Sequence, residues 1–339
     1  MKNNNSCGRL SRSDNTDTDI MAKKISIKKL AEELNLAPST VHRALSGHPN
    51  VSLNTRREVL RVSQMKGYML PVHDKGSIAV IVPYLSFKGY LGCLLPHLEA
   101  EFHQRGFRLM IVSEADIAIL GDHMFDGIVS LVWKDGFGKL LPQKFSIPTI
   151  TLNAQANPME NIPDIKSDNR KGIKMALDYL HSRGCRKIFY ISTSDISHVP
   201  DAAERLEVFR QFCSETGQNY YDSHMEIHTS EIEQNIPVIL NADPDACFCA
   251  SETFAVKVGH LLKAAGKKIP EDISLMGLED NYANAYFSPP ITAICQNFEQ
   301  IAKMAANQIA SACQNKIAPH GGLVPFQLVE RESIREPDK

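Results

Sequence analysis

The sequence predicts an α/β protein in two parts, an N-terminal all-α helix-turn-helix domain and a two-lobed body built on doubly wound parallel sheets. Residues 23–71 carry three short amphipathic helical patterns. From residue 77 onward, short apolar runs alternate with helical segments in two successive series. The 339 residues, of which 43% are apolar, suffice for a small helical domain and one large body.

Charge is unevenly distributed along the chain. Residues 23–71 hold nine Lys/Arg against three Glu, a net charge of +6, whereas the whole chain has −2. Residues 1–22 are neutral, so the part after residue 71 carries −8. A basic end on an acidic body favours a phosphate-bearing partner. Residues 1–22 are polar and predicted to be disordered, and Met21 is an alternative start of translation.

The first part reads as three helices with recognisable starts. Ser26 is a candidate N-cap for a helix with Ile27, Leu30, Ala31 and Leu34 on its apolar face. Pro38 begins a second helix that runs to about Leu45, and Ser52 caps a third that stops at Gly67. The second helix turns Val41, Ala44 and Leu45 inward and Ser39, Thr40, His42 and Arg43 outward. This arrangement predicts a helix-turn-helix whose second helix enters the DNA major groove; the alternative is a solvated helical bundle.

The second part alternates strands and helices. The first series predicts strands at 78–82, 109–112, 127–132 and 149–152, with a helix over 91–105. The second predicts a helix from Asn169 to about 183, a strand at 188–191, a helix over 202–217, a strand at 246–250, a helix over 253–266 and a strand at 273–277. Two such units imply two lobes with a ligand cleft between them, since ligands bind beyond the carboxyl ends of parallel strands.

Several motifs resemble the LacI/GalR (lac and galactose repressor) family of transcription regulators. They are Thr40-Val41-His42-Arg43, Val51-Ser52, Thr55-Arg56, Gly67-Tyr68 and, near the end, Leu328-Val329 followed by Arg331-Glu332-Ser333. The resemblance covers almost the whole chain after residue 22. It implies a periplasmic-binding-protein-like effector domain, a double-stranded DNA operator, a sugar-like effector and a homodimer. The expected DNA-binding residues are Ser26, Pro38, Ser39, Thr40, His42, Arg43, Ser52, Thr55 and Arg56.

The expected domain divisions follow from these patterns. A tail covers 1–22, the helix-turn-helix domain 23–71, a short linker 72–76 and the effector domain 77–335. Within the effector domain, the first lobe takes about 77–164 and 297–322, and the second about 165–296 and 323–335.

The resemblance also implies the effector-binding residues. Arg205 matches an arginine that clamps the effector, and Gln296 a glutamine at a crossover between the lobes. Glu279 stands where Asp is usual, Ser251-Glu252 where Asn-Asp is usual, and Asn153 where Asp is common, so the effector is expected to differ from the family's commonest ones. Phe87, Tyr90 and Trp133 follow strand ends and could stack on a sugar face, with ordinary lobe packing as the alternative.

One departure from the family lies in the linker. The resemblance implies a hinge helix that wedges an apolar side chain into the minor groove. Here Pro71 is followed directly by Val72-His73-Asp74-Lys75-Gly76, which is short and unfavourable for a helix. We therefore expect little operator bending. A cytoplasmic sugar sensor with weakened DNA binding is the corresponding alternative function.

Other classes of function are disfavoured by the sequence. No run reaches the ~18 apolar residues of a membrane span, and no signal-peptide core opens the chain, so a cytoplasmic protein is expected. Cys247 and Cys249 fall in a buried strand pattern and are expected to be reduced core thiols. His224 and His228 lie in a strand-like segment, which disfavours a metal site. No cofactor motif or acid/base pair is evident, so no cofactor is expected and an enzyme is the disfavoured rival.

Overall fold

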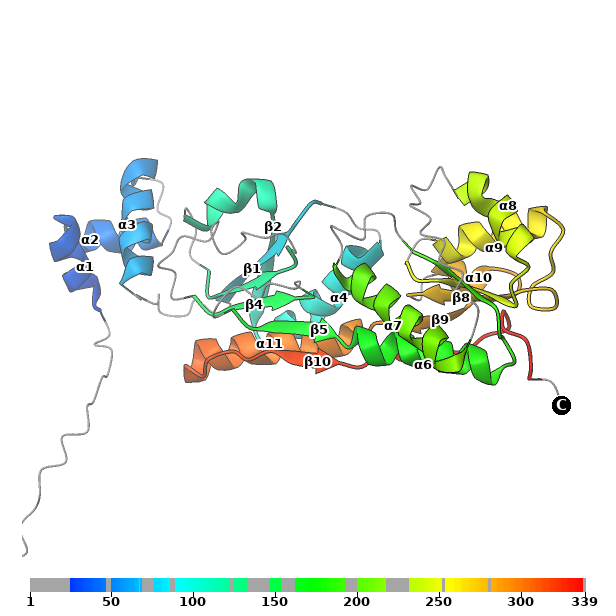
Figure 1. Cartoon of the computed structure of the whole chain (residues 1–339). Helices are drawn as coiled ribbons and strands as arrows, with labels where there is room; N and C mark the ends of the chain where they lie inside the picture. Colours follow the sequence, from blue (N-terminus) through cyan, green and yellow to red (C-terminus); the bar gives the residue numbers. More distant parts are fainter. Residues whose placement is uncertain are drawn as a thin grey trace, which may run out of the picture.

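The computed structural model describes residues 25–46, 50–66, 68, 76–85, 89–121, 125–132, 147–153, 162–192, 200–217, 232–251, 254–279 and 282–337. A three-helix domain lies at one end, a first lobe in the middle and a second lobe at the other end (Figure 1). Within these ranges, no helix is both long and apolar enough to cross a membrane. The predictions that fall outside the described residues concern the tail 1–22, linker residues 72–75, Phe87, Trp133, Glu252, His224 and His228.

The three-helix domain begins where its sequence signals place it. Helices α1 (Ile27–Leu34), α2 (Pro38–Leu45) and α3 (Leu53–Met65) form it. Ser26 Oγ accepts a hydrogen bond from the Lys29 N–H over 3.3 Å, and Ser52 Oγ accepts one from the Thr55 N–H over 3.1 Å, which confirms both N-caps. No side chain caps α2, because Ala37 occupies its N-cap position.

Small and branched apolar side chains hold the three helices together. Their buried members are Leu30, Ala31, Val41, Ala44, Leu45, Val59 and Leu60. An ion pair of 2.9 Å between Lys66 and Glu33 joins the end of α3 to α1 on the surface. Since this core is small, the recognition surface depends on the mutual packing of all three helices.

The first lobe is a six-stranded, fully parallel sheet of order β10-β5-β4-β3-β1-β2. Its strands are β1 (Gly76–Val82), β2 (Phe107–Ser113), β3 (Gly127–Ser130), β4 (Thr149–Leu152), β5 (Asp164–Ser167) and β10 (Gly322–Val324). Helices α4 (Gly89–Gln104) and α11 (Phe298–Asn315) pack on one face, and the 3₁₀ segment η1 (Glu114–Gly121) covers part of the other. Ile78 and Val80 face α4 and α11, while Ala79 and Ile81 face η1, as a strand buried on both sides requires.

The second lobe is a five-stranded sheet of order β11-β9-β8-β7-β6, parallel except for the β11–β9 pair. Its strands are β6 (Ile188–Ile191), β7 (Ala246–Cys249), β8 (Ser274–Leu278), β9 (Thr292–Cys295) and β11 (Gln327–Val329). Helices α6 (Asn169–Ser182) and α7 (Pro200–Thr216) pack on one face, α8 (Ile232–Ala242) and α9 (Phe254–Ala264) on the other, and the short α10 (Tyr282–Tyr286) beside α9. Cys247 and Cys249 are buried free thiols on β7, as expected.

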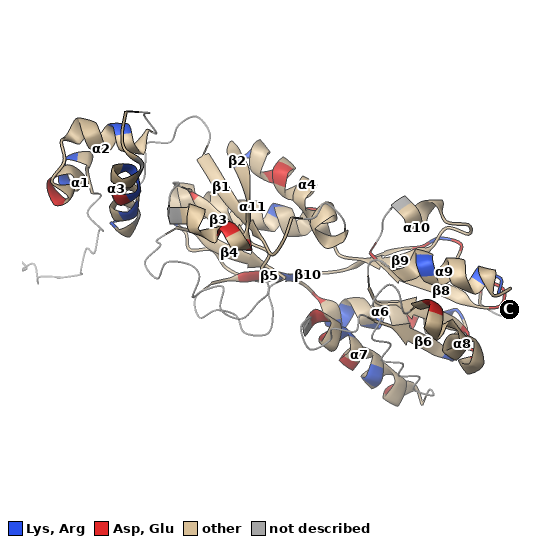
Figure 2. Ribbon diagram, turned by 90° about the horizontal axis from the view of Figure 1, so that it is seen from above, with Lys and Arg blue, Asp and Glu red and all other residues tan. Residues whose placement is uncertain are grey.

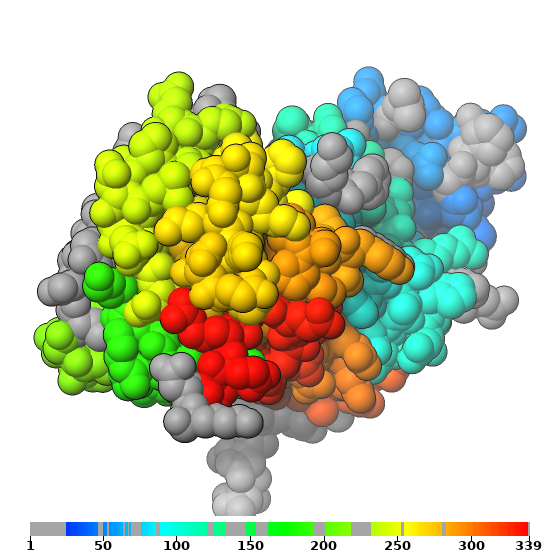
Figure 3. Space-filling model, turned by 90° about the vertical axis from the view of Figure 1, so that its right-hand side faces the viewer, coloured from blue at the N-terminus to red at the C-terminus, as the bar shows by residue number. Residues whose placement is uncertain are grey.

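The C-terminal segment is fastened to the surface of the second lobe. Figure 3 looks onto this end of the molecule and shows the red C-terminal residues beside the green residues of α6. Arg183, the C-cap residue of α6, donates to Glu330 over 3.1 Å and to Glu336 over 3.0 Å, and the Tyr179 hydroxyl also donates to Glu330 over 3.0 Å. These contacts hold the last strand, β11, against its lobe.

The chain crosses between the lobes after β5, after β9 and after β10. The divisions expected at 164 and at 322 therefore need correction, because each falls inside a strand of the first sheet. Gly76, expected to end the linker, instead begins β1, where its backbone pairs with Phe107. The strand expected over 127–132 ends at Ser130. Each shift follows from sheet pairing, which the local pattern of the sequence does not specify.

Candidate functional site

The outer face of α2 is the candidate DNA-reading surface. Ser39, His42 and Arg43 are exposed and Thr40 is half-buried, whereas Val41, Ala44 and Leu45 are buried against α1 and α3. Pro38 is exposed at the first helical position, where its missing N–H leaves no intrahelical bond unmade. Polar side chains near the N-terminus of such a helix reach base edges when the helix lies in the major groove.

Other residues expected to contact DNA already have structural partners. Ser26 and Ser52 cap α1 and α3, and the hydroxyls of Ser52 and Thr55 are hydrogen-bonded over 2.7 Å. Arg56 is half-buried, and its Nε atom has no hydrogen-bond partner within the described part of the chain. The helix N-termini that these serines cap carry backbone N–H groups, which suit phosphate oxygens. Figure 2 shows Lys and Arg residues on the helices of this domain.

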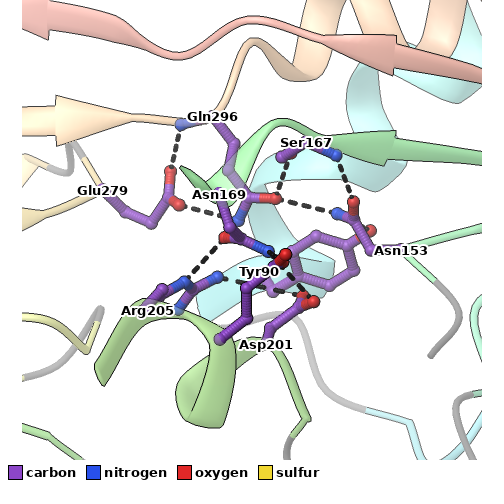
Figure 4. Close-up of polar contacts among 9 residues, drawn as sticks. Tyr90, Asn153, Ser167, Asn169, Asp201, Arg205, Glu279 and Gln296 are labelled. Atoms are coloured by element: carbon purple, nitrogen blue, oxygen red, sulfur yellow. Dashed lines mark hydrogen bonds and ion pairs between the residues drawn. The ribbon is translucent and has the colours of Figure 1, made fainter. Parts of the chain in front are cut away.

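A second candidate site is a hydrogen-bond network where the lobes meet, at the carboxyl ends of strands from both sheets (Figure 4). Gln296, directly after β9, is its centre. The Gln296 Nε2–H donates to Glu279 Oε1 over 2.7 Å, and its backbone N–H donates to Glu279 Oε2 over 3.1 Å. Glu279 directly follows β8 and is 3% exposed. Both carboxylate oxygens of this buried glutamate therefore receive a hydrogen bond from one residue.

The other side of Gln296 faces the first lobe. Its Oε1 atom accepts hydrogen bonds from Asn153 Nδ2 over 2.8 Å and from Ser167 Oγ over 2.6 Å. Asn153 follows β4 and Ser167 ends β5, and Asn153 Oδ1 accepts the Ser167 N–H over 2.8 Å. One glutamine thus links the strand ends of both lobes. Asn153 and Glu279 adopt left-handed backbone φ of 49° and 66°, a conformation uncommon for non-glycine residues and typical of functional sites.

Tyr90, on α4, extends the network within the first lobe. Its hydroxyl oxygen accepts a hydrogen bond from Asn153 Nδ2 over 2.9 Å, and its ring packs edge-on against Phe298. Burial raises the pKa of the Tyr90 phenol well above its usual value, with the charges of Asp201, Asp164 and Glu279 adding to the rise. Tyr90 therefore remains protonated.

Arg205, on α7, belongs to a neighbouring group in the second lobe. Its Nε–H donates to Asn169 Oδ1 over 2.8 Å, and its Nη2 atom lies 3.9 Å from Asp201 Oδ2. Asn169 Nδ2 in turn donates to Asp201 Oδ1 over 3.1 Å and to Glu204 Oε2 over 3.4 Å. Burial raises the pKa of the Asp201 carboxyl, although the charge of Arg205 opposes the rise.

The sequence identified part of this site and missed part of it. Tyr90, Asn153, Arg205, Glu279 and Gln296 lie in the two hydrogen-bonded groups, whereas the Ser251 hydroxyl, half-buried after β7, joins none of their described hydrogen bonds. No sequence pattern predicted Ser167, Asn169 or Asp201 as a site residue. Asp201 lies one helical turn before Arg205, a spacing that could have suggested its role. In the described part of the chain, no three His, Cys, Asp or Glu side chains are grouped to hold a metal.

The chain is similar to known proteins both in sequence and in fold. A model of the periplasmic binding protein-like domain matches residues 177–334. The sucrose operon repressor of Streptococcus mutans is 23% identical over 93% of this chain and 100% of its own length. The repressor CytR of Escherichia coli K12 is 23% identical over 91% of this chain and 96% of its own length.

Solved structures share the fold. The transcriptional regulator CelR–cellobiose complex has a TM-score of 0.66 at 22% identity and covers 91% of this chain and 100% of its own. The lac repressor dimer, bound to operator and the anti-inducer ONPF, has a TM-score of 0.64 at 16% identity, over 92% of this chain and 100% of its own. Both likenesses include the helical domain as well as the two-lobed body.

Proposed function

We propose that this chain is a repressor of the LacI/GalR family that binds operator DNA through α2 under the control of a small, sugar-like effector. The observation that supports the proposal best is the combination of the exposed polar face of α2 with a buried polar network linking both lobes. The first can read bases, and the second can respond to a ligand held between the lobes.

The network supports control by an effector because it joins the lobes through a few hydrogen bonds. Gln296 contacts Asn153 and Ser167 on one side and Glu279 on the other, so a ligand that competes for these groups changes how the lobes are held. A ligand shifts a conformational equilibrium only by its differential affinity for the two states. The polar groups at the lobe boundary can give the ligand different affinities for the two states, because a change in how the lobes are held changes which of these groups the ligand can contact.

We also propose that the repressor is a homodimer. Helix-turn-helix regulators bind paired half-sites, since one small domain buries little surface on DNA. The edge strand β2 of the first lobe exposes Met110 and Ile111, which a second copy of the chain would cover. Analytical ultracentrifugation of the full-length protein tests this assembly, and a monomer on operator DNA would contradict it.

An electrophoretic mobility shift with DNA from upstream of the protein's own gene tests the function. We expect a discrete complex at physiological salt that resists nonspecific competitor DNA and whose affinity changes when one sugar of a panel is added. A protein that binds a sugar but gives no specific complex would instead be a sugar sensor. A specific complex that no sugar affects would retain the DNA-binding part of the proposal and remove the effector part.

A further inference from the structure

The pair formed by Arg205 and Asp201 is close but not hydrogen-bonded. Arg205 Nη2 and Asp201 Oδ2 are 3.9 Å apart, beyond the range of a hydrogen bond. Their side chains are 10% and 22% exposed, so neither atom is freely hydrated. Both residues lie on α7, one turn apart, which fixes their backbones relative to each other.

Asn169 explains why the pair does not close. Its Oδ1 accepts the Arg205 Nε–H over 2.8 Å, and its Nδ2 donates to Asp201 Oδ1 over 3.1 Å. The Asn169 side chain thus lies between the Arg205 guanidinium and the Asp201 carboxylate and keeps the two groups apart. Asn169 is itself 3% exposed at the start of α6, so it cannot swing away without losing both bonds. The Nη2 atom of Arg205 and the Oδ2 atom of Asp201 remain facing each other.

We infer that a hydroxyl group of an uncharged ligand bridges Arg205 Nη2 and Asp201 Oδ2, and that Asp201 thereby sets the site's preference for neutral sugars over sugar acids and phosphates. This inference rests on the proposed function, because it concerns the effector of that same site. A hydroxyl is both donor and acceptor, so one oxygen about 2.8 Å from each atom accepts from Arg205 and donates to Asp201. An ionised carboxylate or phosphate oxygen has no proton to donate to Asp201.

The surrounding charges favour a neutral ligand for the same reason. The carboxylate of Glu204 is hydrogen-bonded to Asn169, and that of Glu279 lies in the adjoining network. Arg205 is the buried cation of this group and already faces Asp201, whereas Arg170, which pairs with Glu204 over 3.0 Å, is exposed. An anion placed beside Asp201 would therefore be repelled by the largely buried carboxylates of Asp201 and Glu279.

Tyr90 supplies a further donor from the first lobe. Its oxygen accepts from Asn153, and within the described residues its hydroxyl hydrogen goes to no acceptor. Burial raises the pKa of this phenol, so it keeps the hydrogen that it can donate. A second oxygen of the same ligand can accept the Tyr90 hydrogen, so a polyol would contact both lobes.

Calorimetric titration of the full-length protein tests the inference. The probes are glucose, galactose and ribose, with glucuronate, galacturonate, glucose 6-phosphate and ribose 5-phosphate as their charged counterparts. We expect at least one neutral sugar to bind and its charged counterpart to bind at least about tenfold more weakly, since one unpaired buried charge costs more than 1.4 kcal/mol. Asp201→Asn should weaken binding of the neutral sugar about tenfold and narrow its advantage over the charged form, because an amide can donate to an anion.

Two controls separate this role from a general structural one. Asp178→Asn removes an exposed carboxylate on α6 that pairs with Lys174, and it should leave both affinities unchanged. The melting temperature of Asp201→Asn establishes that the variant is folded. The inference is overturned if Asp201→Asn keeps the parent's selectivity, if charged sugars bind better than neutral ones, or if no neutral sugar binds. In the first two cases a sugar can still control DNA binding, so the proposed function survives.

Discussion

Asn153 and Gln296 come from different lobes and are joined by a hydrogen bond of 2.8 Å, from Asn153 Nδ2 to Gln296 Oε1. They are 143 residues apart in the sequence, and each directly follows a strand of its own sheet. Because Gln296 also donates two hydrogen bonds to Glu279, this single side chain connects a buried carboxylate of the second lobe to the first.

Removing that connection should destabilise the protein. Gln296→Ala leaves Glu279 Oε1, Asn153 Nδ2 and the Ser167 hydroxyl without their shared partner. We expect the free energy of unfolding to fall by about 2 to 3 kcal/mol, the penalty for unsatisfied buried polar and charged groups. Urea unfolding followed by circular dichroism measures it. Gln300→Ala, on the exposed face of α11, is the matched control, and an equal effect of the two variants would contradict the network's role.

Arg43→Ala should weaken operator binding. Arg43 is exposed one turn into α2, where a guanidinium suits guanine or a phosphate. We expect a loss of at least about tenfold in affinity, since such a contact is worth ~1–3 kcal/mol. Arg186→Ala, an exposed arginine after α6 in the second lobe, removes the same charge away from the three-helix domain. Equal affinities of the two variants in a titrated mobility shift would disprove the assignment of α2 as the reading helix.

Arg205→Ala should abolish effector binding at ordinary concentrations. The truncation leaves Asn169 Oδ1 without its donor and Asp201 without its counter-charge. We expect a loss of about 2–4 kcal/mol in binding free energy, as for a broken charged hydrogen bond in a buried site. Calorimetry with the sugar found by screening measures this loss. Arg170→Ala, an exposed arginine that pairs with Glu204 and Glu207, controls for the change in local charge.

Asp201→Asn should stabilise the ligand-free protein at neutral pH. Burial raises the pKa of the Asp201 carboxyl above its ordinary value of 3.8. The folded state is therefore favoured most at a pH below 3.8, where the carboxyl is protonated in both the folded and the unfolded chain. This advantage is lost as the pH rises through the folded-state pKa, because the buried carboxyl must then ionise. Arg205 and Lys166 oppose the shift, and Glu204 adds to it. The melting temperature of the variant should exceed the parent's by an amount that grows with pH and then levels off. A difference independent of pH between 3.5 and 8 would mean that the ionisation of Asp201 has no effect on folding.

The short linker predicts weak bending of the operator. Without a wedge in the minor groove, the DNA should stay nearly straight, and the ligand should change operator affinity only several-fold, below the ~1–3 kcal/mol typical of allosteric regulators. Mobility shifts with circularly permuted operator fragments measure the bend. A sharp kink centred between half-sites would show that residues 70–75 do fold into a wedge on DNA.

Elements with strong local signals could be predicted from the sequence, and elements without them could not. The three helix starts at Ser26, Pro38 and Ser52, and the apolar runs that form β1, β4 and β6, carry their own capping or burial pattern. Strands β10 and β11 have three residues each, too few to show any period. Helix α11 faces its lobe largely with alanines such as Ala302, Ala305 and Ala306, which give little contrast with its outer face.

The sequence by itself determined the fold class, the segregated basic charge and the candidate residues Arg43, Asn153, Arg205, Glu279 and Gln296. Only the tertiary structure decided which of these side chains meet, and it added Ser167, Asn169 and Asp201. The physical reason is that a hydrogen bond depends on atoms within about 3 Å, whereas periodicity and capping report only on residues a few positions apart. Crossovers after β5 and β9 bring the ends of β4, β5, β8 and β9 to one place, and local sequence patterns do not specify that meeting point.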